Sequence, residues 1–420
     1  MCVRVVVVGG GAVGLAVAYF LAEKGVEVAV VERGRLGEAT SEASAGWLTP
    51  GLSSVPVAAP GVVPQALKWM LNPGSPFYVH PRFSLSLARF LFGFWRSSSE
   101  GRFGAALRAL VAFNRDVLGL LDAMRDAGVE FEMHDTGLVF ACLSTTAAKK
   151  DARAYELLRE AGFTGDVALL DAAEIHELEP GLSDAVEAGV YSRLERHARP
   201  ESLVTGLAAH LRVRGFEVRE NSAVRSISRS PGGWVVALGD EVVLADKVVV
   251  AAGVWSGELL RPLGVRLDFL SGKGYGLTFD GPPAIVRRPM YLSEAKVALS
   301  PFTGALRLGG TLELMAPDTT LAARRIGAIR AAAKRYLRGW ADGEPTTVRT
   351  GQRPLLADSL PVIGGFDGLD GLYVAAGHGM VGITMAAPTG SALAPLVVDG
   401  TSLAELAPFN PGRFGSTRRV

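Results

Sequence analysis

The sequence contains few of the residues that mark secreted, metal-binding or nucleic-acid-binding proteins. Of its 420 residues only Cys2 and Cys142 are cysteines, which excludes a disulfide framework and indicates a reducing, cytoplasmic setting. Two cysteines and six scattered histidines also argue against a structural zinc site, and we expect no metal. The formal net charge is only +1 and no long run of one charge occurs, so nucleic acid is not an expected partner.

Amide side chains are also scarce. Asparagine and glutamine occur only at Gln65, Asn72, Asn114, Asn221, Gln352 and Asn410. A shortage of thermolabile amides is typical of proteins from thermophiles, although a GC-rich genome produces part of the same bias. Apolar residues, in contrast, make up 49% of the chain. A chain of this length and composition builds a large core, divided over two or more domains.

The N-terminus predicts a strand, a glycine-rich turn, a helix and a second strand, in that order. These elements are residues 5–8, the turn Gly9-Gly10-Gly11-Ala12-Val13-Gly14, residues 15–24 and residues 27–31, and Glu32 ends the second strand. A GxGxxG pattern alone is weak evidence, but here each neighbouring element follows at the right spacing. The segment therefore predicts a dinucleotide-binding β-α-β unit.

Each residue type in this unit has a physical reason. Gly9 permits the tight turn, Gly11 lets the backbone approach a pyrophosphate, and Gly14 lets the helix pack closely on the strand. The start of the helix offers free N–H groups to phosphate oxygens. Glu32 can accept hydrogen bonds from a ribose diol, and its charge would repel a 2′-phosphate.

Two long uncharged stretches raise the question of membrane insertion. Residues 5–22 are about as long as a membrane span or, behind Arg4, a signal peptide, and residues 372–398 form a second apolar stretch. The first runs directly into a strand-like segment without a cleavage site, and the second is interrupted by glycines and Pro388. We predict a buried strand, turn and helix in both places.

Segments of the nucleotide-binding type alternate with β-rich segments along the chain. We therefore predict a discontinuous Rossmann-like domain, a helical segment and a substrate-binding domain, and an α/β plus α+β fold class. The first domain comprises residues 1–60, 196–261 and 345–408, the helical segment 61–128, and the substrate-binding domain 129–195 and 262–344, built on a largely antiparallel sheet. Locally, we expect short proline-broken helices over 55–98, one helix over 103–127, strands over 129–143 and a loop over 349–364.

There is no second GxGxxG, so a separate nicotinamide-binding domain is not expected, and a flavin held by one nucleotide-binding fold is the simpler interpretation. Further motifs carry a resemblance: ATSEASAGWLTPG, APGVVPQALKWML, VVVAAGVWS, SGKGYGLT, RLGGTLE, TGQRPLLADSLPVIG and AAGHGMVGITMAAPTG. With them the chain resembles FAD-dependent amine oxidoreductases of the D-amino-acid oxidase superfamily, and most of all its D-amino-acid dehydrogenases of the small-subunit type. The resemblance implies a glutathione-reductase-like FAD-binding domain. Because no cysteine lies near a flavin motif, we expect the FAD to be non-covalent.

The resemblance also implies which residues hold the cofactor. Those expected at the ADP half and the pyrophosphate are Gly9, Gly11, Ala12, Val13, Gly14, Glu32, Arg33, Thr40, Ser41, Ser44, Val224, Ala252, Gly253 and Trp255. Those expected under the isoalloxazine or beside its pyrimidine edge are Ala45, Gly46, Trp47, Leu48, Gly351, Gly377, His378, Gly379, Met380, Val381, Gly382, Ile383 and Thr384.

Three residues are candidates for the chemistry. Arg353, in a Gly-Gln-Arg-Pro motif, matches the arginine that grips the substrate carboxylate, and a planar guanidinium suits that task. Tyr275 matches a tyrosine-bearing segment near the substrate, although a core aromatic is an equal alternative. His378 is a candidate general base, but we expect its backbone and the helix dipole to matter more. Met380 stands where some glycine oxidases have a second arginine, which argues against that assignment.

The predicted function is oxidative deamination of D-amino acids, D-proline included, by hydride transfer from Cα to flavin N5, with electrons passed to a quinone or dye-like acceptor. Two alternatives stay open: a glycine, sarcosine or L-proline oxidase or dehydrogenase of the same superfamily, and a non-catalytic flavoprotein scaffold. The expected location is cytoplasmic. The aromatic-rich stretch 83–95 leaves open a peripheral contact with the inner face of the cell membrane, beside a quinone pool.

Overall fold

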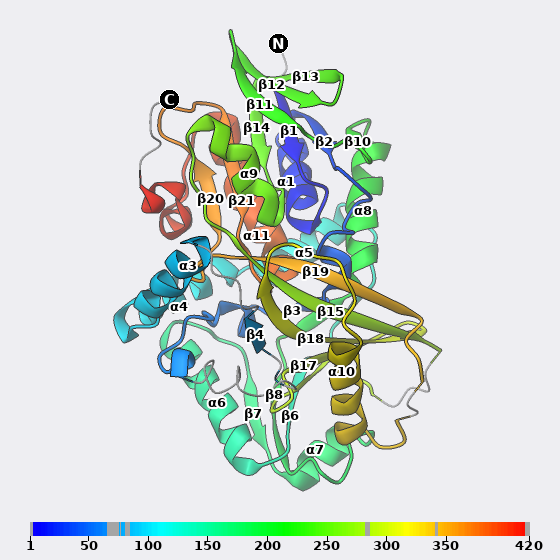
Figure 1. Ribbon diagram of the computed structural model, residues 1–420. Helices are drawn as coiled ribbons and strands as arrows, with labels where there is room; N and C mark the ends of the chain where they lie inside the picture. The colour runs from blue at the N-terminus through cyan, green and yellow to red at the C-terminus, as the bar shows by residue number, and fades with distance from the viewer. Residues whose placement is uncertain are drawn as a thin grey trace.

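The computed structural model describes residues 3–64, 75, 77–79, 85–281, 286–340 and 343–415. Two large β-sheets dominate the molecule, one in the upper and one in the lower half of Figure 1. A three-stranded antiparallel sheet covers the upper one, and a second small sheet joins β3 (Trp47–Leu48), β9 (Arg196–Ala198) and β5 (Met133–His134).

The upper sheet has six strands and begins with the N-terminal unit predicted from the sequence. Its strands are β1 (Arg4–Val8), β2 (Glu27–Val31), β10 (Glu217–Arg219), β14 (Lys247–Val250), β20 (Val362–Gly365) and β21 (Leu372–Ala376). Their order is β10-β2-β1-β14-β21-β20, and all neighbours are parallel except β20 and β21. Strands that are covered on both faces have continuous apolar sequences, which explains the four consecutive valines of β1.

Both faces of the six-stranded sheet are packed. Val5 and Val7 belong to a core shared with α1 (Ala12–Glu23), α8 (Pro200–Val213) and α11 (Gly382–Asp399). Val6 and Val8 point the other way, because side chains alternate along a strand, and pack against the antiparallel sheet. That sheet consists of β11 (Ser226–Ser230), β12 (Gly233–Leu238) and β13 (Glu241–Ala245), and the short α9 (Ser256–Leu260) lies on the same side.

The lower sheet has nine strands. They are β4 (Phe77–Val79), β6 (Leu138–Cys142), β7 (Val167–Leu170), β8 (Ala188–Ser192), β15 (Leu270–Asp280), β16 (Met290–Leu292), β17 (Val297–Phe302), β18 (Ala305–Met315) and β19 (Thr347–Leu355). The order is β19-β15-β18-β17-β16-β6-β8-β7, with β4 added beside β18, and only the β16–β6 and β18–β4 pairs are parallel. The helices α6 (Thr145–Glu160), α7 (Ala172–Leu178) and α10 (Ala323–Tyr336) pack against it.

Three further helices connect the two halves: α3 (Leu85–Ser97), α4 (Glu100–Asn114) and α5 (Val117–Asp126). Short 3-10 turns complete the described elements: η1 (Ser41–Ala43), η2 (Leu52–Ser54), η3 (Gly253–Trp255), η4 (Arg261–Leu263), η5 (Ala404–Phe409) and η6 (Pro411–Phe414). Over the part of the chain that the structure describes, no helix combines the length and the apolar character that a bilayer span requires.

The predicted fold class is confirmed: a Rossmann-like parallel sheet and a largely antiparallel second sheet alternate along the chain. Two local predictions are wrong. Residues 349–364 are not a loop but contain most of β19 and β20, and the single helix over 103–127 is two helices, α4 and α5. The segment 345–408 also contributes to both sheets, since β19 pairs with β15. The other domain boundaries stay predictions, and residues 65–74, 76 and 80–84 of the expected proline-broken helices lie outside the described residues.

Candidate active site

A cavity of about 1210 Å³ runs between the two large sheets. Its walls come from the carboxyl ends of β1, β2, β14 and β21, from the loop after β2, and from the central strands of the nine-stranded sheet. Ligands of open α/β sheets bind at this end of the strands. Of the residues predicted to hold a cofactor, only Gly46 and Leu48 do not line this cavity.

The glycine-rich turn forms one end of the cavity and leaves no room for side chains. Gly9 has a φ of +117°, and a Cβ there would lie 2.4 Å from the Ala251 carbonyl oxygen. A Cβ on Gly14 would lie 2.0 Å from the Gly9 carbonyl oxygen. The N–H of Ala12 donates to Ser41 Oγ at 3.1 Å, which ties the start of α1 to the loop after β2. The first two contacts are the tight turn and the close helix packing expected of Gly9 and Gly14 in a dinucleotide-binding unit.

The acidic residue at the end of β2 is held in place by the backbone. Glu32 accepts hydrogen bonds from the N–H groups of Gly10, at 2.8 Å, and Gly34, at 3.1 Å. A carboxylate has about four acceptor sites, so lone pairs remain for a ribose diol. Beside it the guanidinium of Arg33 lies 3.5 Å from the centre of the Trp255 ring, and both side chains border the cavity.

The loop after β2 then crosses the middle of the cavity. The N–H of Gly46 donates to Ser44 Oγ at 3.1 Å, and Gly46 has a φ of +76° with the Ala198 carbonyl oxygen only 2.0 Å from where a Cβ would be. Trp47 Nε1 donates to Ser300 Oγ at 3.0 Å, which fixes the indole against β17. Gly46 and the fully buried Leu48 therefore shape this wall without bordering the cavity.

The loop that begins at Gly377 leads into α11 and brings the first turn of this helix, with Thr384, to the cavity wall. The first turn of a helix has N–H groups without acceptors inside the helix, so it attracts negative charge. Thr384 Oγ1 donates to the Trp47 carbonyl at 2.9 Å, which joins the two loops. His378 Nε2 is 3.0 Å from Thr389 Oγ1, and burial lowers the pKa of His378 to about 3. The imidazole is therefore neutral at physiological pH and bonded to the protein, which favours a positioning role over a general base.

Arg353 lies at the other end of the cavity, on β19. Its Nη1 donates to the carbonyl of Thr311 at 2.5 Å, and no carboxylate pairs with it among the residues that the structure describes. The guanidinium covers Gly274 of β15, where a Cβ would lie 2.1 Å from Cζ and both terminal nitrogens. Burial lowers the pKa of Arg353 to about 10, so it stays charged at neutral pH. A half-buried cation without a counter-charge is suited to bind an anionic ligand.

Tyr275 does not line this cavity, which favours the core aromatic over a role at the substrate. Its side chain is fully buried in the core on the α10 side of the sheet. The hydroxyl donates to Glu313 Oε2 at 2.9 Å, and Glu313 in turn accepts from Arg325 Nε of α10 at 3.0 Å. The cavity face of β15 carries Gly274 instead.

Several cavity residues were not expected from the sequence. Lys296, in the turn between β16 and β17, borders the cavity next to Tyr291. A second group forms an apolar wall, namely Val55, Val57, Val62, Val63, Phe77, Val79, Phe90, Leu91 and Phe94. The helical spacing of the aromatic residues in α3 indicated that Phe90 and Phe94 share one face. No such pattern marked Lys296, because a lysine in a hairpin turn is normally solvated.

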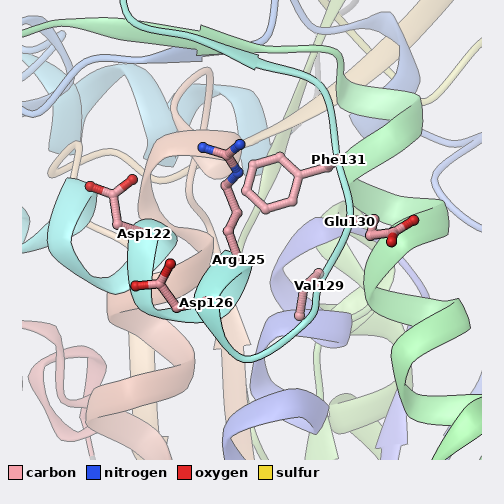
Figure 2. Close-up of a pocket in the computed structure, with 6 residues that line it drawn as sticks. All are labelled: Asp122, Arg125, Asp126, Val129, Glu130 and Phe131. Carbon is pink, nitrogen blue, oxygen red and sulfur yellow. The ribbon is translucent and has the colours of Figure 1, made fainter.

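A second hollow of about 600 Å³ lies beside the end of α5 and contains none of the predicted site residues. Figure 2 shows its charged lining, in which the carboxylates of Asp122, Asp126 and Glu130 do not converge on one point. Asp122 is paired with Arg196 at 2.7 Å. Within the described ranges, no group of three or more His, Cys, Asp or Glu residues is placed to hold a metal ion.

The arrangement combines a turn of the dinucleotide-binding type with a cation, Arg353, in the same cavity. A family model described as FAD dependent oxidoreductase (DAO) matches residues 4–396, and the chain belongs to this family. It is therefore an FAD-dependent oxidoreductase, and the glycine-lined turn with Glu32 fits the ADP half of that cofactor. The assignment of single residues to parts of FAD stays a prediction.

Individual relatives and solved structures agree with the assignment to this family. The chain is 32% identical over 410 residues to a D-amino acid dehydrogenase of Cereibacter sphaeroides, covering 94% of this chain and 91% of that protein. A second strain has a D-amino acid dehydrogenase that is 31% identical over 432 residues, covering 99% of this chain and 96% of that protein. Among solved structures, glycine oxidase from Geobacillus kaustophilus aligns with a TM-score of 0.77 and 24% identity, over 99% of both chains. L-proline dehydrogenase from P. horikoshii aligns with a TM-score of 0.72 and 18% identity, over 99% of both chains. These structures share the fold.

Proposed function

We propose that this protein is a D-amino-acid dehydrogenase. The observation that carries the proposal is the cation of Arg353, which borders the same cavity as the glycine-rich turn and lacks a carboxylate partner among the described residues. An amino acid offers the missing carboxylate. The similarity to the D-amino acid dehydrogenases of C. sphaeroides extends over nearly the whole chain and supports the D-configuration.

The residues of the chain supply positioning rather than acid–base chemistry. Arg353 would hold the α-carboxylate through two parallel hydrogen bonds, which orients the Cα–H bond. His378 is neutral and bonded to Thr389, so it would support the loop at the start of α11 without taking a proton. The substrate must arrive with a neutral amine, because its lone pair assists the departure of hydride. FAD, when bound, accepts the hydride and its two electrons, and water hydrolyses the imino acid after release unless it is cyclic, as from D-proline.

The test is a panel of D- and L-amino acids with glycine and sarcosine, assayed with an artificial dye and separately for hydrogen peroxide. We expect the D-forms to exceed the L-forms in kcat/KM by roughly a hundredfold, since reversing the configuration displaces the Cα–H bond. A preference for glycine, sarcosine or L-proline would assign the protein to another activity of the family. Failure of every substrate to bleach the flavin without oxygen would favour a non-catalytic scaffold.

We further propose that the electrons pass to a quinone rather than to oxygen. The apolar wall of the cavity, from Val55 to Phe94, suits a quinone ring and its isoprenoid tail better than it suits water. Stopped-flow mixing of the reduced enzyme should show slow reoxidation by air and fast reoxidation by a short-chain ubiquinone. Reoxidation by air at the rate of turnover with dye would make the protein an oxidase.

The helix α3 is our candidate for peripheral membrane contact. Its inner face borders the cavity through Phe90 and Phe94. Its outer face exposes Leu85, Phe92 and Trp95 to between 61% and 67%. Arg89 and Arg96 are exposed on the same helix and would favour an anionic bilayer.

Replacing Phe92 and Trp95 together by serine should weaken binding to anionic vesicles by about a hundredfold or more, since each buried aromatic contributes about 1.5 kcal/mol or more. Sedimentation with phosphatidylglycerol vesicles measures this. The matched control is Val242→Ser with Leu244→Ser, another exposed apolar pair on β13, which should leave vesicle binding unchanged. Equal losses in the two double variants would show that α3 has no special part in binding.

A further inference from the structure

The cavity contains a second cation that the proposed reaction does not use. Lys296 ends the turn between β16 and β17 and borders the cavity. Its Nζ lies 5.1 Å from the centre of the Tyr291 ring, and the edge of that ring meets Trp47. No acidic side chain forms an ion pair with Lys296 in the described part of the chain. Burial lowers the pKa of Lys296, and Lys150 adds to this while Asp151 and Glu294 oppose it.

The acidic groups nearest to Lys296 have other partners. Asp151 accepts a hydrogen bond from Ser293 Oγ at 2.6 Å and lies 3.6 Å from Cys142 Sγ. Glu294 accepts from Tyr336 Oη at 2.7 Å and from the Leu143 N–H at 3.0 Å. These contacts hold Ser293 and Glu294, at the beginning of the turn. The carboxylate of the turn therefore pairs with other groups and not with the Lys296 ammonium group.

The backbone at Lys296 is strained. Its φ is +56°, in the left-handed region that glycine and asparagine adopt readily and a long side chain seldom does. Strain of this kind persists mainly at functional sites. A lysine at a position that suits glycine indicates that its side chain has a use there.

Lys296 borders the same cavity as Arg353. Ala298 of β17 pairs with Gly309 of β18, and continuing this antiparallel register by two residues brings Lys296 level with Thr311. The Thr311 carbonyl holds Arg353. Arg353 extends from β19 across β15 to this carbonyl, and Lys296 precedes β17 on the other side of β18.

Taking the proposed function as its basis, we propose that Lys296 binds the side-chain carboxylate of an acidic D-amino acid while Arg353 binds its α-carboxylate. Two cations that border one cavity from opposite sides of β18 match a molecule that has two carboxylates separated by a short aliphatic chain. The rings of Trp47 and Tyr291 would cover the methylene groups between them. D-Aspartate and D-glutamate are the substrates of this class.

The test compares wild-type protein with Lys296→Met, which keeps the aliphatic stem and removes the charge. With D-alanine and D-leucine, kcat/KM should change by less than about threefold, whereas with D-glutamate or D-aspartate it should fall by about a hundredfold, as for other lost charge-assisted contacts. Glutarate has no amine to oxidise and gives a readout without turnover. It should inhibit the wild type more strongly than butyrate does, and this difference should disappear in Lys296→Met.

Lys150→Met is the matched control, because Lys150 is exposed and lies near the same carboxylates; it should behave as the wild type does. Lys296→Gly is the second variant and should fold at least as well, because glycine relieves the strain at this φ. Equal losses for D-alanine and D-glutamate would overturn the proposal, since Lys296 would then act on every substrate. Wild-type protein that oxidises D-alanine but neither acidic substrate would also overturn it, while leaving the proposed dehydrogenase activity intact.

Discussion

Replacing Arg353 by alanine should lower kcat/KM for D-amino acids by more than about a hundredfold while FAD stays bound. The variant removes a charge-assisted, two-bond contact that costs about 3 kcal/mol of transition-state stabilisation to lose. The site makes the effect large because the guanidinium is surrounded by protein and its described partner is a neutral carbonyl, that of Thr311. No charged side chain is paired with it among the described residues.

Steady-state kinetics with D-alanine and the visible absorbance of bound flavin measure the two parts of this prediction. Arg353→Lys is the informative companion, because it keeps the charge and loses the planar fork. We expect it to fall between wild type and Arg353→Ala. Wild-type efficiency in a folded, flavin-loaded Arg353→Ala protein would mean that another residue holds the carboxylate.

Gly274→Ala should cause a loss of similar size without removing any functional group. The added methyl would lie 2.1 Å from the Arg353 guanidinium, a distance that no real contact shows, so the guanidinium must move. A misplacement of about 1 Å at a substrate anchor costs on the order of a hundredfold in rate. Kinetics should show a raised KM for amino acids, with a normal flavin spectrum.

A double-mutant cycle separates this effect from general damage to β15. If the methyl acts only through Arg353, then Gly274→Ala combined with Arg353→Ala should be no worse than Arg353→Ala alone. Additive losses in the double variant would show that Gly274→Ala disturbs the sheet itself. Gly327→Ala in α10, where a Cβ meets nothing within 4 Å, is the control for a harmless methyl.

The cofactor end of the site could be predicted because its signals are local. Gly9, Gly14 and Glu32 act within one β-α-β unit, and their spacing reflects contacts between neighbouring elements. The structure gives each of them the expected surroundings, from the backbone packed against Gly9 to the N–H groups bonded to Glu32. Arg353 also lies in the cavity, as its motif led us to expect, although its contact with a carboxylate stays a prediction.

The edge of the nine-stranded sheet could not be predicted, because its stability is not local. The segment of β19 reads TVRTGQRPL, which lacks apolar alternation and contains both Gly351 and Pro354. Its hydrogen-bond partner, β15, precedes it by a long stretch of chain and pairs with it over nearly the full length. Proline is accepted there because β19 is an edge strand.

Side-chain direction explains why Tyr275 does not line the cavity. In the segment Gly272-Lys273-Gly274-Tyr275-Gly276 the glycines share one face and the larger residues the other. Close approaches occur on the glycine face, by Arg353 at Gly274 and by the Ala43 carbonyl at Gly276. The sequence carried a signal for this direction in the alternation of glycine with larger residues. A strand face made only of glycine indicates that other groups pack closely against it. Tyr275 lies on the opposite face.

The order of the strands also determines when the cofactor site becomes complete during synthesis. The turn that faces the pyrophosphate lies between β1 and α1, at the beginning of the chain, but its other walls are β14, from Lys247, and α11, which ends at Asp399. Pairing over such sequence separations is slow, since a long loop must close first. A nascent chain therefore exposes the apolar face of α1 until α11 has been made, and FAD is captured late, by a nearly finished polypeptide. Any fragment that stops before α11 lacks the wall that this helix gives to the cavity, even though it contains the whole glycine motif.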